Sequence, residues 1–431
     1  MAIRLNASDA NFEAAFRDLL SMKREVSDDV DAIVREIIDQ VKTLGDQALF
    51  DYTAKFDRFD ARAKGLAITK AEIEAAVAQV DPDVMKALEL AAERIRSHHA
   101  RQMPNNESYE DALGVKLGSR WTAIEAVGLY VPGGLAAYPS SVLMNAIPAK
   151  VAGVKRLVMV VPTPDDILNP LVLAAAKLAG VDEIYRIGGA QAVAALAHGT
   201  DSIAPVYKIV GPGNAFVAAA KRRVFGLVGI DMIAGPSEVL ILADKNNDPD
   251  WLAVDLMAQA EHDTAAQAML ITDDPEMAEA VEKAVERLLT TLPKAEIAGT
   301  SWRDYGAVIT VKDWETGMAL ANRIAPEHLE FAMDGAADMV DKVHNAGAIF
   351  VGHFTPEAVG DYVGGSNHVL PTARSARFSS GLSTLDFVKR TSVLECNAMN
   401  LREIGPAAIT LARQEGLEAH ALSVAKRLNM A

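Results

Sequence analysis

The chain of 431 residues contains a single cysteine, Cys396, which limits the chemistry open to it. No disulfide can form within the chain, and zinc sites built from several thiolates are excluded. A bound metal ion would therefore need histidine, carboxylate or amide-oxygen ligands.

Long apolar runs are missing as well. The opening MAIRLNASDANF lacks the basic flank and apolar stretch of a signal peptide. No apolar run reaches the roughly 18 residues that a membrane-spanning helix needs. We therefore expect a cytoplasmic protein that makes no use of a membrane.

Basic residues are outnumbered, since 42 Lys and Arg against 58 Asp and Glu give a formal net charge of −16. No dense basic cluster offsets this balance, so nucleic acid is not expected as a partner. The length favours two or more domains. Aromatic residues make up only 6%, and the abundance of Ala, Val, Ile and Leu is typical of layered α/β proteins.

Two stretches alternate short apolar strands with helices. The first runs from AIEAVGLYVPGG, near residue 123, to NAFVAAAKRRVFG, and the second from EVLILAD to AGAIFVG. This alternation predicts βαβ units and parallel sheets. Before residue 123 the apolar residues follow helical spacing, as in DDVDAIVREIIDQV, and predict helices.

A long polar segment rich in glycine and serine follows Gly352. Loops of this length in compact domains are usually functional or disordered. Its apolar residues, among them Tyr362, Val369 and Phe378, argue against disorder. After it the pattern becomes helical again and ends in EGLEAHALSVAKRLNM.

Glycine turns follow two predicted strands, in YRIGGAQAV and KIVGPGNAF. Neither completes the G-x-G-x-x-G pattern of dinucleotide sites, because Phe216 stands where the third glycine would fall. A helix N-terminus can hold a phosphate without the full pattern. An ordinary helix cap in a tight turn explains these glycines equally well, so the residues leave both interpretations open.

Four of the nine histidines stand near acids or amides. They are His262 after Gln259, His328 after Glu327, His368 after Asp361, and His420 after Glu415. Each pair alone is more often structural than functional. Together they supply imidazole, carboxylate and amide donors suited to zinc, and an acid–imidazole pair suited to proton transfer. Spacing does not show that these separate segments converge.

Several long motifs together resemble the histidinol dehydrogenase family. They occur in the family's order, cover nearly the whole chain and are weakest before residue 115. They are GLYVPGGLAAYPSSVLMNAIPAKVAGV, KIVGPGNAFVAAAKRRVFG, IDMIAGPSEVLILAD, AQAEHD, APEHLE, GDYVGGSNHVLPT, ARFSSGLS and EGLEAHA.

The resemblance implies a zinc-containing homodimer that oxidises L-histidinol through L-histidinaldehyde to L-histidine while two NAD are reduced. It places one zinc per subunit on Gln259, His262, Asp361 and His420. In the family's catalytic pair, His328 would take the alcohol proton. Glu327 would activate the water that adds to the aldehyde. Mn²⁺ could occupy the same donor set.

The resemblance also implies contacts to both substrates. NAD contacts fall on Tyr130, Gln191 and Asn214. In the family the C-terminal segment reaches into the partner's site, so the tail is expected to dock on a second subunit. Substrate contacts fall on Ser237, Gln259, His262, Glu327, His328, Asp361, His368, Glu415 and His420.

The fold implied is α/β, with two Rossmann-like domains in an aldehyde-dehydrogenase-like architecture, an incomplete dinucleotide fold and small terminal helical segments. We expect a helical segment over 1–26 and a first domain, with zinc and catalytic residues, from 27–128 and 237–381. The NAD-side domain should span 129–236, and a helical tail 382–431.

Two positions depart from the family's pattern, with Phe216 where tyrosine is expected and Ser366 where proline is common. Both adjoin assigned residues and leave those residues intact. One alternative is a paralogue that oxidises another small polar alcohol with two NAD. A second is a catalytically silent zinc or nucleotide binder, which the presence of Glu327 and His328 disfavours.

Overall fold

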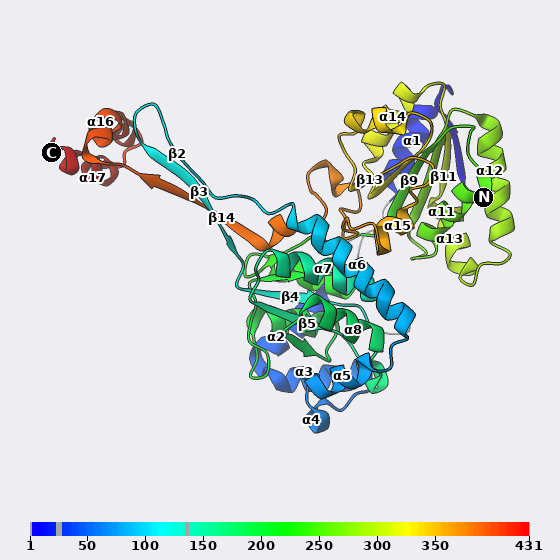
Figure 1. The fold of residues 1–431 in the computed structure, drawn as a ribbon, viewed down its shortest axis with the longest axis horizontal. Helices are drawn as coiled ribbons and strands as arrows, with labels where there is room; N and C mark the ends of the chain where they lie inside the picture. Colours follow the sequence, from blue (N-terminus) through cyan, green and yellow to red (C-terminus); the bar gives the residue numbers. More distant parts are fainter. Residues whose placement is uncertain (1, 23–27, 134–137, 234, 431) are drawn as a thin grey trace.

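The computed structural model describes residues 2–22, 28–133, 138–233 and 235–430. Two parallel sheets, each covered by helices, form two bodies, and an arm extends away from them (Figure 1). The predicted fold class, α/β with two parallel units, is confirmed. Among the described residues, no helix is long and apolar enough to cross a membrane.

The larger sheet has six parallel strands. In spatial order they are β1 (Ile3–Asn6), β11 (Ala307–Thr310), β10 (Gln267–Thr272), β9 (Glu238–Ala243), β12 (His328–Ala332) and β13 (Ala348–Val351). Strands β9, β10 and β12 are buried at every residue, as expected for inner strands covered on both faces.

Helices cover both faces of this sheet and form two apolar cores with it. These helices are α1 (Phe12–Ser21), α11 (Pro249–Ala260), α12 (Pro275–Leu288), α13 (Ala295–Tyr305) and α14 (Trp314–Ile324), with the short 3₁₀ helix η2 (Ala336–Lys342). Helix α15 (Glu357–Tyr362) packs against α11, and the short 3₁₀ helix η3 (Ser375–Arg377) follows later in the chain.

The second sheet has five parallel strands, in the order β6 (Glu183–Tyr185), β5 (Arg156–Val160), β4 (Ala126–Tyr130), β7 (Lys208–Val210) and β8 (Gly229–Ile230). Helices following its strands pack on both faces. They are α7 (Pro139–Val151), α8 (Pro170–Ala179), α9 (Gly189–His198) and α10 (Ala215–Val224), with η1 (Pro164–Asp166) between β5 and α8.

Five helices between residues 28 and 100 also cover the five-stranded sheet. The sequence had led us to group 27–128 with 237–381, the segment that holds most of the six-stranded sheet. Helix α2 packs against α9 and α10, and α6 against α7. An apolar stripe shows which face of a helix is buried but not which sheet buries it. The helices concerned are α2 (Asp28–Leu44), α3 (Asp46–Asp57), α4 (Ala61–Lys64), α5 (Lys70–Val77) and α6 (Pro82–Ala100).

The N-terminal segment differs from expectation as well. Residues 1–26 were expected to be a separate helical piece, and their described part does contain the helix α1, yet the segment is not separate, because β1 pairs with β11 as the edge strand of the six-stranded sheet, Ile3 opposite Ala307. Four residues of strand are too few for periodicity to reveal.

The arm is a three-stranded antiparallel sheet that the sequence did not predict. Its strands are β2 (Glu107–Glu110), β3 (Lys116–Ala123) and β14 (Val388–Glu395), and β14 pairs with β3 along its whole length. Helices α16 (Ala398–Gln414) and α17 (Glu418–Leu428) sit at its far end, at the left of Figure 1. The tail from 382 therefore begins with η4 (Thr384–Phe387) and a strand before it becomes helical.

Candidate active site

An acid–imidazole pair lies at the amino end of β12, an inner strand of the six-stranded sheet between β9 and the edge strand β13. Glu327 and His328 are 5% and 3% exposed. The His328 Nδ1–H donates to the carbonyl of Glu238 at 3.0 Å. Nε2 has no hydrogen-bond partner within the described residues. Because burial lowers the pKa of His328 to about 3, the ring is neutral near pH 7 with its lone pair at Nε2.

The Glu327 carboxylate is held by the same residue of the neighbouring strand, Glu238 of β9. Its Oε2 accepts a hydrogen bond from the backbone N–H of Glu238 at 2.9 Å and lies 3.8 Å from His328 Nδ1. Strand β9 thus orients both members of the pair through one residue. A fixed carboxylate beside a neutral imidazole is equipped to accept protons from two different atoms of a substrate.

Side chains with atoms suited to hold a metal ion lie next to this pair. Gln259 stands at the end of helix α11, His262 follows two residues after the helix, and α11 packs against α15, which carries Asp361. The Gln259 Nε2 lies 3.0 Å from His262 Nδ1. The Gln259 side chain is fully buried, and its Oε1 has no partner within the described residues. A buried amide oxygen without a donor fits a cation ligand.

Asp361 joins the two groups. Its Oδ1 is 3.9 Å from His328 Nε2, and burial raises the pKa of its carboxyl to about 6. Ligand atoms of His328, Glu357 and Asp361 all lie within 4.8 Å of one another, a spacing that suits a metal ion. Beside it, Gln259, His262 and Asp361 offer the amide, imidazole and carboxylate atoms that zinc or a similar divalent ion takes as ligands.

Two further residues from the sequence prediction lie at the same site. His368 places Nδ1 3.0 Å from the carbonyl of Asp361, and its Nε2 is 3.4 Å from Ser141 Oγ of the other domain. Ser237 directly precedes β9 and is half-buried. The structure thus brings together Ser237, Gln259, His262, Glu327, His328, Asp361 and His368 around the edge of one sheet.

Glu415 and His420 are not part of this group within one chain. Both are exposed, Glu415 at the end of α16 and His420 in α17. Figure 1 shows these helices at the tip of the arm, apart from α11 and α15.

Buried acids behind His328 were missed by sequence reasoning. Glu357 places Oε1 3.6 Å from His328 Nδ1, and burial, then Asp361, raises its pKa well above the ordinary value. Burial, followed by the charge of Asp255, raises the pKa of Glu330 to about 8. The signal was present in HLEFA, where Glu330 stands between two apolar residues of a short strand.

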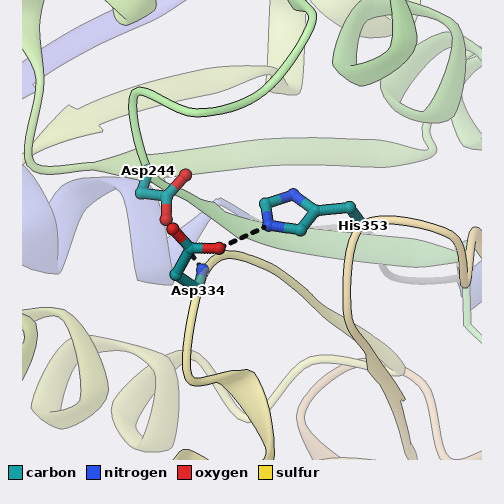
Figure 2. A group of neighbouring side chains, drawn as sticks. All are labelled: Asp244, Asp334 and His353. Atoms are coloured by element: carbon teal, nitrogen blue, oxygen red, sulfur yellow. Dashed lines mark hydrogen bonds and ion pairs between the residues drawn. The ribbon is translucent and has the colours of Figure 1, made fainter.

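A second group of donors lies at the opposite, carboxyl end of the same sheet. Figure 2 shows Asp334 between Asp244 and His353. Asp244 accepts from the backbone N–H groups of Asn246 and Asp334 at 2.9 and 2.8 Å, and His353 contacts Asn247 and Asp334 at 2.8 and 3.3 Å. The polar atoms of this group are hydrogen-bonded to one another. We therefore assign the group a structural role, in which it holds the ends of three strands together.

The three predicted NAD residues share the carboxyl end of the five-stranded sheet. Tyr130 ends β4, and its hydroxyl accepts the Gly189 N–H at 3.0 Å. Gln191, 2% exposed, leaves Oε1 without a partner within the described residues. Asn214 caps α10 after β7. Strands β4 and β7 adjoin where the strand order reverses, which is where open α/β sheets bind ligands.

This fold and site define a two-domain α/β enzyme with a buried acid–base pair beside metal donors. Comparison with known sequences agrees. The pattern of the histidinol dehydrogenase family matches residues 20–428. Histidinol dehydrogenases of Rhizobium meliloti and Brucella suis are 67% and 66% identical over 430 residues, covering 100% of this chain and 99% and 100% of theirs.

Solved structures agree as well. The crystal structure of histidinol dehydrogenase from Elizabethkingia anophelis is similar with a TM-score of 0.95 and 36% identity, over 99% of this chain and 98% of that one. The chain belongs to the histidinol dehydrogenase family, and is accordingly an NAD-dependent oxidoreductase of a zinc-binding family that acts on histidinol.

Proposed function

We propose that the chain carries out both oxidations, from L-histidinol through L-histidinaldehyde to L-histidine, at one site formed between two copies of the chain. The observation that carries the proposal is the position of Glu327 and His328 beside Gln259 and Asp361, all at one sheet edge. Proton acceptors and metal donors are then within reach of one substrate molecule.

The zinc would be held by Gln259, His262 and Asp361 of one copy and by His420 of the second. When bound, the metal would supply a Lewis acid that helps to orient the substrate, and NAD would supply the hydride acceptor. The unpartnered Oε1 of Gln259 supports its assignment as a ligand. The chain itself contributes the orientation of the substrate and the movement of protons.

In the first oxidation, Nε2 of His328 takes the proton of the substrate hydroxyl as hydride leaves the carbon that carries this hydroxyl. The bond from Nδ1–H to Glu238 supports this role, because it fixes the tautomer in which Nε2 carries the lone pair. The aldehyde stays in place for the second step because its amino and imidazole groups are unchanged and keep the contacts that held histidinol.

In the second oxidation, Glu327 takes a proton from water as the water oxygen adds to the aldehyde carbon, and the proton that His328 holds from the first step passes to the aldehyde oxygen, which gives the hydrate. The hydrate then loses hydride to a second NAD while His328 Nε2 accepts a hydroxyl proton, so that the carboxylic acid forms. The bond from Glu238 N–H to Glu327 Oε2 supports this role by holding the carboxylate in one orientation.

The remaining contacts follow the same division. Ser237 and His368, with Glu415 of the second copy, would orient histidinol. Tyr130, Gln191 and Asn214 would contact NAD across the domain boundary, and the contact of His368 with Ser141 supports a substrate position at that boundary.

A homodimer is part of the proposal. Glu415 and His420 are exposed at the end of an arm, and apolar side chains on that arm, including Leu394, Met399 and Leu411, are 66%, 71% and 63% exposed. Such surface is unfavourable in water and suits burial against a second copy. A cytoplasmic location, where NAD is at hand, completes the proposal.

The decisive experiment counts NADH. The purified, zinc-loaded protein is incubated with limiting L-histidinol and excess NAD until absorbance at the NADH maximum stops rising. Two NADH per histidinol, with histidine as the product, would support the proposal. One NADH, with aldehyde released, would contradict the assignment of both steps to one site, and no turnover would favour a different alcohol.

A further inference from the structure

The segment that carries Asp361 and His368 bridges the two domains. It begins in α15 of the six-stranded domain, yet Val363 and Val369 pack against the apolar core of the five-stranded domain. Further along, the Thr372 hydroxyl accepts the backbone N–H of Gly235 at 2.6 Å. The position of Asp361 and His368 thus depends on what holds this segment to the other domain.

Asn367 is the main polar anchor of the segment, and it is 9% exposed. Its Nδ2 donates to the carbonyl of Met144 in α7 at 2.7 Å and lies 3.3 Å from His99 Nε2. Its Oδ1 accepts the backbone N–H of Val369 at 2.9 Å. Every polar atom of the amide is therefore engaged, two of the contacts reaching into the five-stranded domain.

His99 completes the anchor from α6 and is fully buried. Its Nδ1–H donates to the Ile95 carbonyl at 2.7 Å, so Nε2 is the atom that accepts from Asn367. Burial lowers the pKa of His99, which keeps the ring in this neutral form. The two side chains meet as donor and acceptor in a buried interface.

Backbone contacts on either side seat the segment on α6. The Arg94 guanidinium donates to the carbonyls of Val363 and Gly364 at 2.5 and 3.1 Å. Gly365 has a φ of +95°, and a Cβ there would lie 3.0 Å from the Arg94 carbonyl oxygen. Only glycine allows this close approach without strain.

We propose that His99 and Asn367 are a positioning pair that sets Asp361 and His368 relative to the NAD-side domain. The inference rests on the proposed function, since it takes Asp361 as a zinc ligand and His368 as a substrate contact. Neither member of the pair is among the residues proposed to contact substrate or cofactor. The pair acts through the next residue, His368, which spans from the Asp361 carbonyl to Ser141 of α7.

The test uses Asn367→Ala, Asn367→Asp and His99→Gln in the full-length protein. Asn367→Asp keeps the Val369 contact and loses the two donated bonds, so it is informative if the alanine variant folds poorly. Zinc affinity should fall about 10- to 100-fold, as for other residues that orient ligands. The KM for histidinol should rise while the KM for NAD stays within about twofold.

A spectroscopic readout separates positioning from loss of stability. The visible absorption of the Co²⁺-loaded protein reports ligand geometry and should change in these variants. Asn169→Ala is the matched control, because it removes an amide that caps α8 in the same domain and has no contact with the segment. It should lower the melting temperature and leave zinc affinity and the Co²⁺ spectrum unchanged.

Unchanged zinc affinity, Co²⁺ spectrum and KM in the Asn367 variants would overturn the inference, whatever happens to their melting temperature. The double variant His99→Gln with Asn367→Ala should lose no more zinc affinity than Asn367→Ala alone, because the residues act as one unit. A wild-type protein that binds no zinc would instead overturn the proposed function itself, a result recognised before any variant is measured.

Discussion

The imidazole of His328 donates its Nδ1 proton to the backbone carbonyl of Glu238, 3.0 Å away on the neighbouring strand. The N–H of Glu238 in turn donates to the carboxylate of Glu327. One residue of β9 therefore fixes the ring tautomer and the carboxylate orientation together. Side chains fixed to a sheet hold their geometry better than groups on loops do, which suits the proton-accepting roles proposed for this pair.

Glu327→Gln should separate the two oxidations. The amide oxygen can still accept from Glu238, so the geometry is kept, but the side chain no longer takes a proton from water. We expect histidinaldehyde oxidation to fall on the order of 10²- to 10⁴-fold. Histidinol oxidation to the aldehyde should change only a few-fold. Single-turnover NADH formation from each substrate measures both rates, and equal losses would refute the separate roles.

His262→Asn should remove bound zinc, because it deletes one donor next to the unpartnered Oε1 of Gln259. Activity should fall by more than about 100-fold, beyond the loss typical of residues that only orient a ligand. Metal content after dialysis, measured by elemental analysis, gives the direct readout.

His353→Asn is the control for that experiment, since His353 belongs to the self-satisfied group in Figure 2. It should leave zinc content unchanged. If the His353 variant lost zinc and the His262 variant kept it, the metal would lie at the carboxyl end of the sheet, and the assignment of His262 as a ligand would be wrong.

Asn214→Asp and Asn214→Ala should distinguish a cofactor contact from a helix cap. The Asn214 Oδ1 accepts from the N–H groups of Phe216 and Val217, and an aspartate keeps this cap. It loses the Nδ2 donor and repels the pyrophosphate, so the KM for NAD should rise about tenfold or more. The alanine variant should also lose about 1 kcal/mol of unfolding free energy. An unchanged KM in both variants would remove Asn214 from the NAD site.

Periodicity predicted most of the strands and helices of both α/β units, because a strand such as β9 is apolar from Val239 to Ala243 and is followed by a helix with a clear cap. It did not predict the edge strands β1 and β8 or the helix α13. Strand β3 escaped notice because its residues are nearly all half-exposed, which leaves no apolar face to recognise. The placement of α2 escaped for a different reason, because its stripe of Val34, Ile37 and Val41 fits any apolar surface.

Resemblance to the family's motifs predicted the site residues. It could not show that these residues lie close together in the folded chain. Gln259 and Asp361 are about a hundred positions apart, and only the packing of α11 on α15 brings them together. The buried acid Glu357 lies in none of the quoted motifs, and Glu330, the last residue of APEHLE, was marked only by its apolar neighbours in HLEFA. Their altered pKa values arise from burial by residues distant in sequence, which no local pattern records.

Glu330→Gln should stabilise the protein at alkaline pH. The pKa of Glu330 is raised from 4.5 to about 8, chiefly by burial and then by Asp255, so the folded chain keeps a proton that the unfolded chain has lost. The stability that the folded chain has with this carboxyl neutral is fully present below pH 4.5, and it is lost as the pH rises through 8. Glutamine cannot ionise and should raise the melting temperature on the order of 5 °C at pH 8.5.

The difference between the Glu330 variant and wild type should shrink at pH 5, where both side chains are neutral. Glu296→Gln, on the exposed surface of α13 in the same domain, serves as the control and should show no such pH dependence. An effect of Glu330→Gln that is equal at both pH values would mean that the carboxyl is not protonated in the folded state.

His328→Asn and His420→Asn should complement each other if the site is shared. Each variant alone is expected to be inactive. In a mixed population, half of the dimers would pair the two variants, and one of the two sites in such a dimer would combine an intact His328 with an intact His420. Activity should therefore recover to about a quarter of the wild-type value after mixing, unfolding and refolding together.

His328→Asn mixed with His262→Asn is the matched control, because both substitutions lie in the same body of the chain and every mixed site would carry one of them. It should recover nothing. If the first mixture also recovers nothing while refolded wild type is active, then His420 does not act in trans, and the exposed helices at the tip of the arm would need another explanation. Recovery in the first mixture alone would make dimerisation a condition of catalysis, because the arm of one copy would supply what the sheet edge of the other lacks.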